Sequence, residues 1–397
     1  MKVINHQTNM LMVTGLARSG TTLLAECLNH HSKVMCISDI MNELLKGFVR
    51  YAYYYVKNEK KNSNYPVDNF FFSGSDEVSN FIDQTDLKHK IPSYLRNEII
   101  SKTIQRDGGY NPEIISHVKK CKSESFDLLF LEIMQILHET YGNSDTEVFG
   151  IKTTWCEQLI KPLSNTFENM RFINILRDPR AVVASNYMSS ESTRYPIIMS
   201  IRDWRKSVYY SWKFQNKYKS MSDKFISVQY ENLVDNSEDI LKEITKFIGI
   251  QYNISMINST FKSPNTSYEG SSANGRISKR YKDRWKNVLI NDFILQIEMY
   301  CSSEMEKLGY KKVNSKHKID FFKLLSLKQI DYESVPSWCD EIIYNKQYYE
   351  NTWLIYNSLL EITRKILLES PDKMEDENLI NNFFYEKDYL SWLLSST

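Results

Sequence analysis

The chain has 397 residues, of which 42% are hydrophobic and 25% are charged, which is typical of a globular protein with one large or two ordinary domains. The chain has 50 Lys and Arg against 49 Asp and Glu, so its net charge is close to zero. No overall positive charge would attract nucleic acid or an anionic membrane, and we expect the protein to bind neither. The six Cys are scattered without a C-x-x-C pair, and no apolar run reaches about 18 residues, the length that would span a membrane. These features predict no zinc site, no disulfide framework, no signal peptide and a cytoplasmic location.

Short apolar runs alternate with helical patterns along the chain. The runs predicted to be strands are Met10–Thr14, Val148–Ile151, Phe172–Leu176 and Phe225–Val228, and the first predicted helix is Thr21–Leu28. This alternation predicts an α/β fold in which helices flank a parallel sheet. The first strand, turn and helix also have the order that a phosphate-binding loop requires.

Two regions interrupt or follow this pattern. Residues 44–145 are Tyr-rich and polar, with "NFFFSGSDE" and "IQRDGGYNPE" as loop signals, and we predict a mostly helical insertion that binds an acceptor. Residues 320–397 follow the Lys-rich "KKVNSKHK" and show helical spacing from Tyr349 to Leu367, which Ser370-Pro371 ends. We therefore predict a domain at 1–318 and a helical extension at 319–397.

The segment "GLARSGTT", Gly15–Thr22, has the outline of a phosphate-binding loop. In such a loop, backbone N–H groups point inward at the positive end of the following helix and form an anion site. Thr21 stands where loops that bind nucleoside triphosphates carry Lys, and Arg18 is the nearest cation. The alternative is a tight turn that carries a surface Arg.

A second anion site is predicted in "ILRDPRAVVASNYM". Arg177 ends a predicted strand and Ser185 follows eight residues later, on the next helix. A guanidinium and a hydroxyl suit a second phosphate, although Arg177 could instead pair with Asp178. Two separate phosphate sites without a metal site suggest a nucleotide that is phosphorylated at both its 3′ and 5′ positions.

Five segments, in order, resemble the motifs of sulfotransferases that use 3′-phosphoadenosine 5′-phosphosulfate (PAPS): "GLARSGTTLLAECL", "GIKTT", "ILRDPRAVVASNY", "VQYENLV" and "RWKNVL...LGY". The resemblance covers about residues 10–45 and 146–312. It implies an enzyme that transfers the sulfuryl group from PAPS to a hydroxyl or amine and releases adenosine 3′,5′-bisphosphate, with no metal.

The resemblance also implies roles for individual residues. The loop would hold the 5′-phosphate and the sulfuryl group, Arg177 and Ser185 the 3′-phosphate, and Tyr230 the adenine. The basic segment "GRISKRYKDRWK" would close over the 3′-phosphate, unless it is only a solvated basic face. The residues implied to bind the nucleotide are Arg18, Ser19, Gly20, Thr21, Thr22, Arg177, Ser185, Tyr230, Lys279 and Arg280.

Lys152 matches a lysine near the sulfuryl group, where a cation neutralises charge on the bridging oxygen; it would act together with Arg18. The alternative is a salt-bridged surface Lys. Cytosolic sulfotransferases carry a catalytic His where Thr154 stands here. The chain is closer to the tyrosyl-protein type and its bacterial relatives, in which a carboxylate base lies 21 residues after the loop Arg; that position is Asp39.

Two alternative bases and one alternative role for Asp39 stay open. Glu43 lies four residues beyond Asp39, on the same face if the segment is helical. Asp39 could instead cap the helix that follows. His89, in "LKHKIP", is a more remote candidate.

The acceptor is expected to be a small molecule or a carbohydrate, because aromatic faces of a Tyr-rich insertion suit sugar rings, phenols and cations. Two other functions stay open: a P-loop kinase that uses ATP and magnesium, and a non-catalytic nucleotide-binding protein. The sequence does not indicate an oligomeric state.

Overall fold

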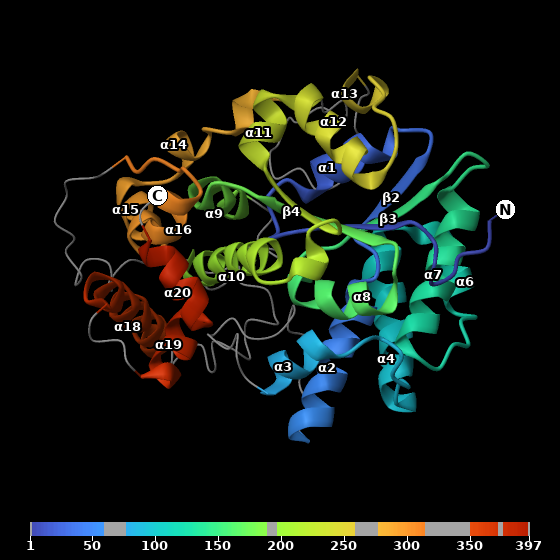
Figure 1. Cartoon of the computed structure of the whole chain (residues 1–397), viewed down its shortest axis with the longest axis horizontal. Helices are drawn as coiled ribbons and strands as arrows, with labels where there is room; N and C mark the ends of the chain where they lie inside the picture. Colours follow the sequence, from blue (N-terminus) through green and yellow to red (C-terminus); the bar gives the residue numbers. More distant parts are fainter. Residues whose placement is uncertain are drawn as a thin grey trace.

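The computed structural model describes residues 2–58, 77–188, 197–258, 277–313, 350–371 and 376–395. Five parallel strands form one sheet in the order β2-β3-β1-β4-β5 (Figure 1). Their bounds are β1 Met10–Thr14, β2 Val34–Ser38, β3 Val148–Lys152, β4 Met170–Leu176 and β5 Phe225–Gln229. The predicted parallel α/β fold is confirmed. Because β1 is central, the loop that follows it lies between the carboxyl ends of β3 and β4, where ligands of open α/β sheets bind.

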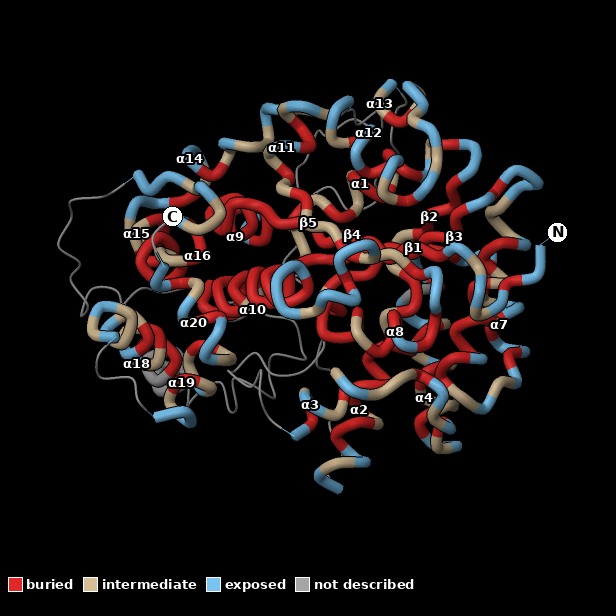
Figure 2. Tube along the Cα trace, in the orientation of Figure 1, coloured by how far each residue is buried: buried red, intermediate tan, exposed pale blue. Residues whose placement is uncertain are grey.

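Helices cover both faces of the sheet (Figure 1). Along β1, Met10 and Met12 point into one core and Leu11 and Val13 into the other, as the two-residue period of a strand requires. On the Leu11 face pack α1 Thr21–Asn29, α11 Tyr230–Asp235, α12 Ser237–Ile248 and α13 Ser255–Asn258. On the Met10 face pack α2 Asn42–Lys57, α7 Phe126–Tyr141, α8 Ile160–Thr166 and α10 Ile197–Asn216. Strands β1 to β4 are largely buried between these two layers, whereas the edge strand β5 is partly exposed (Figure 2).

The crossover from β2 to β3 contains the predicted helical insertion. Between α2 and α7 it adds α3 Glu77–Gln84, α4 Ser93–Lys102, the π-helix η1 Thr103–Asp107, α5 Gly108–Tyr110, η2 Pro112–Ile114 and α6 Ile115–Val118. Phe48 of α2 and Leu129 of α7 belong to the same core as Met12, so these two helices are part of the sheet's covering layer.

One loop expectation within the insertion was wrong. The segment "IQRDGGYNPE" is largely helical, because it forms η1, α5 and η2. Gly108 serves close packing there: a Cβ at this position would lie 2.8 Å from Ile115 Cγ1. Most of "NFFFSGSDE", residues 69–76, lies outside the described residues.

Helices that follow β4 and β5 form a second packed group. These are α9 Pro179–Tyr187, the short η6 Lys279–Tyr281, α14 Trp285–Val288, α15 Asn291–Tyr300 and α16 Ser302–Lys307. All of them except η6 share a core with α10, in which Trp204 is fully buried. This core lies directly behind the carboxyl end of β4.

The C-terminal helices are α18 Glu350–Glu369, α19 Glu377–Phe384 and α20 Lys387–Leu394, and α18 ends before Ser370-Pro371, as predicted. The start of the predicted extension, residues 319–349, lies outside the described part of the chain. Within the described ranges, no helix combines the length and the apolar character needed to cross a membrane.

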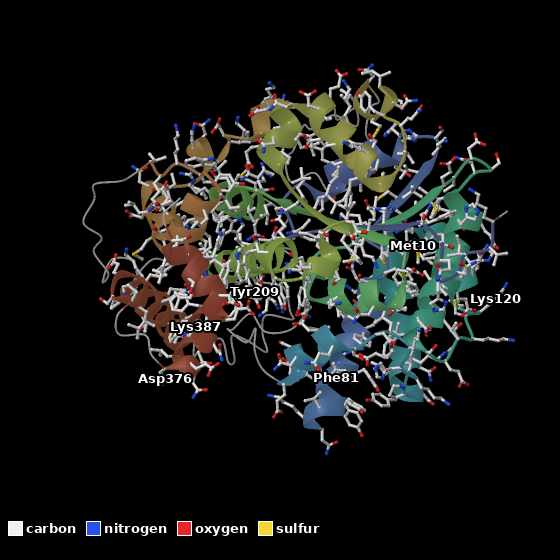
Figure 3. All side chains as sticks on the ribbon, in the orientation of Figure 1. Met10, Phe81, Lys120, Tyr209, Asp376 and Lys387 are labelled. Carbon is white, nitrogen blue, oxygen red and sulfur yellow. The ribbon has the colours of Figure 1, made fainter. Side chains whose placement is uncertain are left out.

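Buried ion pairs join α18 to the rest of the protein. Glu361 is fully buried and accepts hydrogen bonds from Arg202 Nε at 2.7 Å and Arg205 Nη2 at 2.8 Å, both on α10. Tyr209, labelled in Figure 3, stacks on Tyr385 with ring centroids 4.4 Å apart. Breaking a buried pair costs about 3–5 kcal/mol, so we expect the C-terminal helices to be an integral part of the fold.

Candidate functional site

The loop after β1 has the backbone of an anion-binding turn. Gly15, Arg18 and Gly20 have φ values of 140°, 72° and 104°, a region in which only glycine is unstrained. The two glycines are also required by space. A Cβ at Gly15 would lie 2.5 Å from the Ile175 carbonyl oxygen, and a Cβ at Gly20 would lie 2.4 Å from Tyr230 Cδ2.

Ser19 holds the loop from inside. Its hydroxyl donates to the Leu16 carbonyl at 2.6 Å and its backbone N–H donates to the same oxygen at 3.1 Å. Gly20 then begins α1 without a side-chain cap, and Thr21 and Thr22 form its first turn. The first N–H groups of a helix have no intrahelical acceptor, so the positive end of α1 faces the loop.

Asp39 and Lys152 meet at the carboxyl ends of β2 and β3. Lys152 Nζ lies 2.6 Å from Asp39 Oδ1, and the side chains are 3% and 14% exposed. The Asp39 N–H also donates to the Lys152 carbonyl at 2.9 Å. Asp39 does not cap the next helix, because the N-cap of α2 is Met41, which makes no side-chain cap bond. Lys152 is therefore salt-bridged, as in the alternative considered above, but it is buried and its partner is Asp39, the predicted base.

Glu43 lies in a different environment from Asp39. Because Asp39 and Met41 both have positive φ, α2 begins only at Asn42, and the two carboxylates do not share the helical face considered above. Glu43 is fully buried, with Arg106 Nη1 at 2.6 Å and Lys46 Nζ at 3.4 Å from its Oε1. Burial alone would raise the pKa of Glu43, but the surrounding cations, Lys46 first and then Arg106, hold it below its ordinary value.

His89 lies within an aromatic group of the insertion. Its Nδ1 is 3.1 Å from the Tyr51 hydroxyl and its Nε2 is 2.6 Å from the Thr85 hydroxyl. Tyr51 is nine residues beyond Asn42 on α2, roughly 13 Å along the helix axis. The structure therefore does not bring His89 to the strand ends where Asp39 and Lys152 meet.

Arg177 connects three parts of the site. It follows β4 and is 6% exposed. Its Nη1 donates to the Arg18 carbonyl at 3.0 Å, and its Nη2 donates to the Tyr281 carbonyl of η6 at 2.9 Å. Its Cζ lies 4.2 Å from the centroid of the Tyr230 ring. The guanidinium thus joins the loop after β1, the basic segment and α11.

Asp178 pairs with Arg180 and does not take up the charge of Arg177. It caps α9 by accepting from the Arg180 N–H at 2.9 Å, and its Oδ2 lies 2.6 Å from Arg180 Nη2. Arg180 also contacts Glu298 at 2.5 Å. Both Asp178 oxygens are occupied, and no group of three or more His, Cys, Asp or Glu in the described ranges gathers as metal ligands do.

Glu231, next to Tyr230, fixes the backbone after Arg177. It accepts from the Asp178 N–H and from the Tyr310 hydroxyl, each at 3.0 Å. Burial raises the pKa of Glu231, against the lowering effect of the Asp178 N–H. The segments "QYENLV" and "LGY", which lie far apart in the sequence, therefore meet directly behind the site.

The remaining predicted nucleotide residues are less closely gathered. Ser185 is buried on α9, six residues after Pro179 and roughly 9 Å along the axis. Lys279 is exposed, 4.0 Å from Asp235. Arg280 borders a hollow of about 300 Å³, whose other lining residues are Tyr281, Asp283, Arg284 and Asn287.

Sequence reasoning missed two contacts of the site. Trp155 has a φ of 58° and donates its backbone N–H to the Gly15 carbonyl at 3.2 Å, so it holds the start of the loop. The Tyr281 carbonyl accepts from Arg177. Backbone groups act in both contacts, so no residue type signals them in the sequence.

Comparisons with known proteins give a consistent result. A family model described as "Sulfotransferase family" matches residues 11–253. A Caenorhabditis briggsae protein, provisionally named protein-tyrosine sulfotransferase, is 22% identical over 260 residues, which cover 64% of this chain and 70% of that protein.

Solved structures with partial similarity include two sulfotransferase domains. One is from the Synechococcus PCC 7002 olefin synthase, with a TM-score of 0.46 and 14% identity, covering 78% of this chain and 98% of that one. The other is from the curacin biosynthetic pathway, with a TM-score of 0.45 and 14% identity over 77% and 99% of the two chains. Retinol dehydratase, solved with androsterone and the inactive cofactor PAP, has a TM-score of 0.35 and 12% identity over 78% and 83%.

Proposed function

The chain belongs to the sulfotransferase family and is an enzyme, and we propose that it transfers the sulfuryl group of PAPS to a small-molecule or carbohydrate acceptor. The observation that carries the proposal is the contact between Asp39 and Lys152, 2.6 Å apart at the strand ends beside the loop. This contact brings a base for the acceptor and a cation for the leaving group to one place.

Two anion sites support PAPS as the donor. The loop from Gly15 to Thr22 offers the positive end of α1 and Arg18 to the 5′-phosphosulfate. Arg177 offers a guanidinium to the 3′-phosphate, with Ser185, Lys279 and Arg280 as further proposed contacts. The buried Nε of Arg177 has no hydrogen-bond partner among the described residues, so this group retains donor capacity.

A P-loop kinase fits these residues less well. Kinase-type loops use a Lys to reach the terminal phosphates and a strand-end Asp to hold magnesium. Thr21 replaces that Lys, and both oxygens of Asp178 are engaged by Arg180. The charge of the site therefore comes from the arginines and Lys152.

In the proposed reaction, Asp39 accepts the proton of the acceptor hydroxyl as the oxygen–sulfur bond forms. The bond between sulfur and the bridging phosphate oxygen breaks, and Lys152 neutralises the charge that develops on that oxygen. The ion pair couples these two steps. Once Asp39 is protonated it no longer neutralises Lys152, so the ammonium is released as its new partner gains charge.

We propose that the acceptor approaches from the insertion, residues 44–145. The first turn of α2 is tied to the end of β3 by a hydrogen bond from Thr153 to Asn42, and Asn111 donates to the Ser38 carbonyl at 3.2 Å. Asn111, an insertion residue, thus contacts the residue directly before Asp39. We expect the residues that select the acceptor to lie within the insertion.

Two measurements test the proposal. Calorimetry should show tight binding of adenosine 3′,5′-bisphosphate and weak binding of ATP–Mg²⁺; the reverse order would support a kinase. Labelled PAPS should then transfer its label to at least one member of an acceptor panel of phenols, sugars, amines and a tyrosine-containing peptide. Binding without transfer to any acceptor would favour a non-catalytic nucleotide-binding protein.

A further inference from the structure

Tyr230 is placed to act on Arg177. The residue is 5% exposed, so little of its ring is accessible to a nucleotide base. One edge of the ring lies against Gly20, where even a methyl group would come within 2.4 Å of Cδ2 and 3.0 Å of Cε2. The face of the ring carries the Arg177 guanidinium, with Cζ at 4.2 Å from the centroid.

We propose that Tyr230 is a positioning residue that holds Arg177 for the 3′-phosphate, and that the ring makes no stacking contact with the adenine. The inference rests on the proposed function, because it concerns how the donor nucleotide is recognised. It replaces the role that family resemblance implies for Tyr230.

The hydrogen bonds of Arg177 show why its guanidinium needs the further support of the Tyr230 ring. Only two described acceptors, the Arg18 and Tyr281 carbonyls, bind the guanidinium, and both are backbone groups, one in the loop after β1 and one in the short helix η6. Among the described residues no carboxylate forms an ion pair with it: Asp178 pairs with Arg180, and nearby Glu231 accepts from the Asp178 N–H and the Tyr310 hydroxyl. A carboxylate partner would neutralise the charge that a phosphate needs, whereas an aromatic face restrains a guanidinium and leaves its N–H groups and its charge available.

Gly20 completes the arrangement. The ring can occupy this position only because Gly20, the residue directly before α1, has no side chain. Tyr230 therefore touches the 5′-phosphosulfate loop and the predicted 3′-phosphate residue together. The same ring sets the distance between the two anion sites, and we expect it to favour nucleotides that carry both phosphates.

The test compares two nucleotides across four proteins. Affinities for adenosine 3′,5′-bisphosphate and adenosine 5′-phosphate are measured by calorimetry for the wild type, Tyr230→Leu, Arg177→Ala and the double variant. We expect Tyr230→Leu to weaken bisphosphate binding about tenfold or more, the size of a desolvated cation–π contact. Tyr230→Leu should change the affinity for adenosine 5′-phosphate by the same factor as Arg177→Ala does. The double variant should bind the bisphosphate no more weakly than Arg177→Ala alone.

Controls separate positioning from unfolding. Tyr230→Phe keeps the ring and should retain bisphosphate affinity within a few-fold. Tyr252→Leu removes a partly buried Tyr from the same core and should leave both affinities unchanged. If Tyr230→Leu does not fold, Tyr230→Met, which fills the space without a ring, takes its place.

Three outcomes are distinct. If Tyr230→Leu weakens both nucleotides by an equal factor and adds to Arg177→Ala, then Tyr230 stacks on the base and the inference is wrong. If it weakens neither, the contact with Arg177 has no role in binding, and the inference is also wrong. If the wild type itself does not prefer the bisphosphate, the proposed donor is wrong, independently of Tyr230.

Discussion

Replacing Asp39 by Asn removes the charge of the proposed base and preserves its shape. At 2.6 Å the attraction to Lys152 is about 6 kcal/mol for an effective dielectric constant near 20. Most of this attraction offsets the cost of burying both ions, which is several kcal/mol each. Removing one partner leaves Lys152, which is 3% exposed, without its counter-ion, and this typically costs about 3–5 kcal/mol. We expect Asp39→Asn to lie near the lower limit, because Asn still accepts a hydrogen bond.

The stability and the rate should change for different reasons. Urea unfolding of Asp39→Asn should show a loss of about 3 kcal/mol, a large share of a typical total of 5–15 kcal/mol. Turnover of labelled PAPS should fall about 10²–10⁴-fold, the usual contribution of a general base. Affinity for adenosine 3′,5′-bisphosphate should not fall, because Asp39 is proposed to contact the acceptor and not the nucleotide.

A double variant separates the two effects. Asp39→Asn with Lys152→Met removes both charges and should recover much of the lost stability, but none of the lost activity. Asp39→Asn with turnover within about fivefold of the wild type would refute the role of Asp39 as base. A fully stable Asp39→Asn would instead show that the ion pair is more exposed to solvent than its 14% and 3% exposures indicate.

Three further predictions concern other parts of the site and the fold. Glu43→Gln should destabilise the protein by about 3–5 kcal/mol, because it removes the carboxylate of a buried ion-pair cluster with Lys46 and Arg106. It should change kcat of the folded enzyme by no more than a few-fold, and an inactive but stable variant would make Glu43 the base. Arg177→Ala should weaken the binding of adenosine 3′,5′-bisphosphate at least tenfold in calorimetry, since each hydrogen bond to a charged group contributes about 1.5–3 kcal/mol. Unchanged affinity would show that Arg177 does not bind the nucleotide. Burial would raise the pKa of Glu361, but Arg205 and Arg202 lower this pKa to about 2. The ionised Glu361 therefore stabilises the fold fully above pH 4.5, and this stabilisation is lost as the pH falls toward 2. The urea concentration at the unfolding midpoint should decrease over this pH range in the wild type and should decrease less in Glu361→Gln.

Local patterns predicted the loop and four of the five strands; β2 was not predicted. The four runs read as strands correspond to β1, β3, β4 and β5, and the first helix begins at Thr21, as expected. Such elements depend on short-range periodicity and on glycine, which a single sequence displays directly. The same reasoning favoured Asp39 over Glu43 by its distance from Arg18. It did not predict the left-handed conformation of Asp39 and Met41, which places the two carboxylates in different surroundings.

Contacts between residues far apart in the chain could not be predicted from the sequence. The pairing of Asp39 with Lys152 joins residues 113 positions apart, and that of Arg177 with the Tyr281 carbonyl joins residues 104 apart. Both pairings require the sheet order, which follows from tertiary packing and not from local preference. The helicity of "IQRDGGYNPE" was missed for another reason: its two glycines indicate a loop, whereas Gly108 serves close packing against Ile115.

The ion pairs of Glu361 also bear on how the protein is made. Arg202 is 159 residues ahead of its partner in the chain, and at about 5–20 residues per second a ribosome takes roughly 8–30 s to reach Glu361. During that interval α10 carries two arginines whose burial is not yet compensated, so the half-made protein is expected to keep this helix in water or on a chaperone. Residues 1–313 would then complete their folding only after the C-terminal helices are synthesised. Ribosome-bound chains that stop short of residue 361 should be cleaved by proteases at α10.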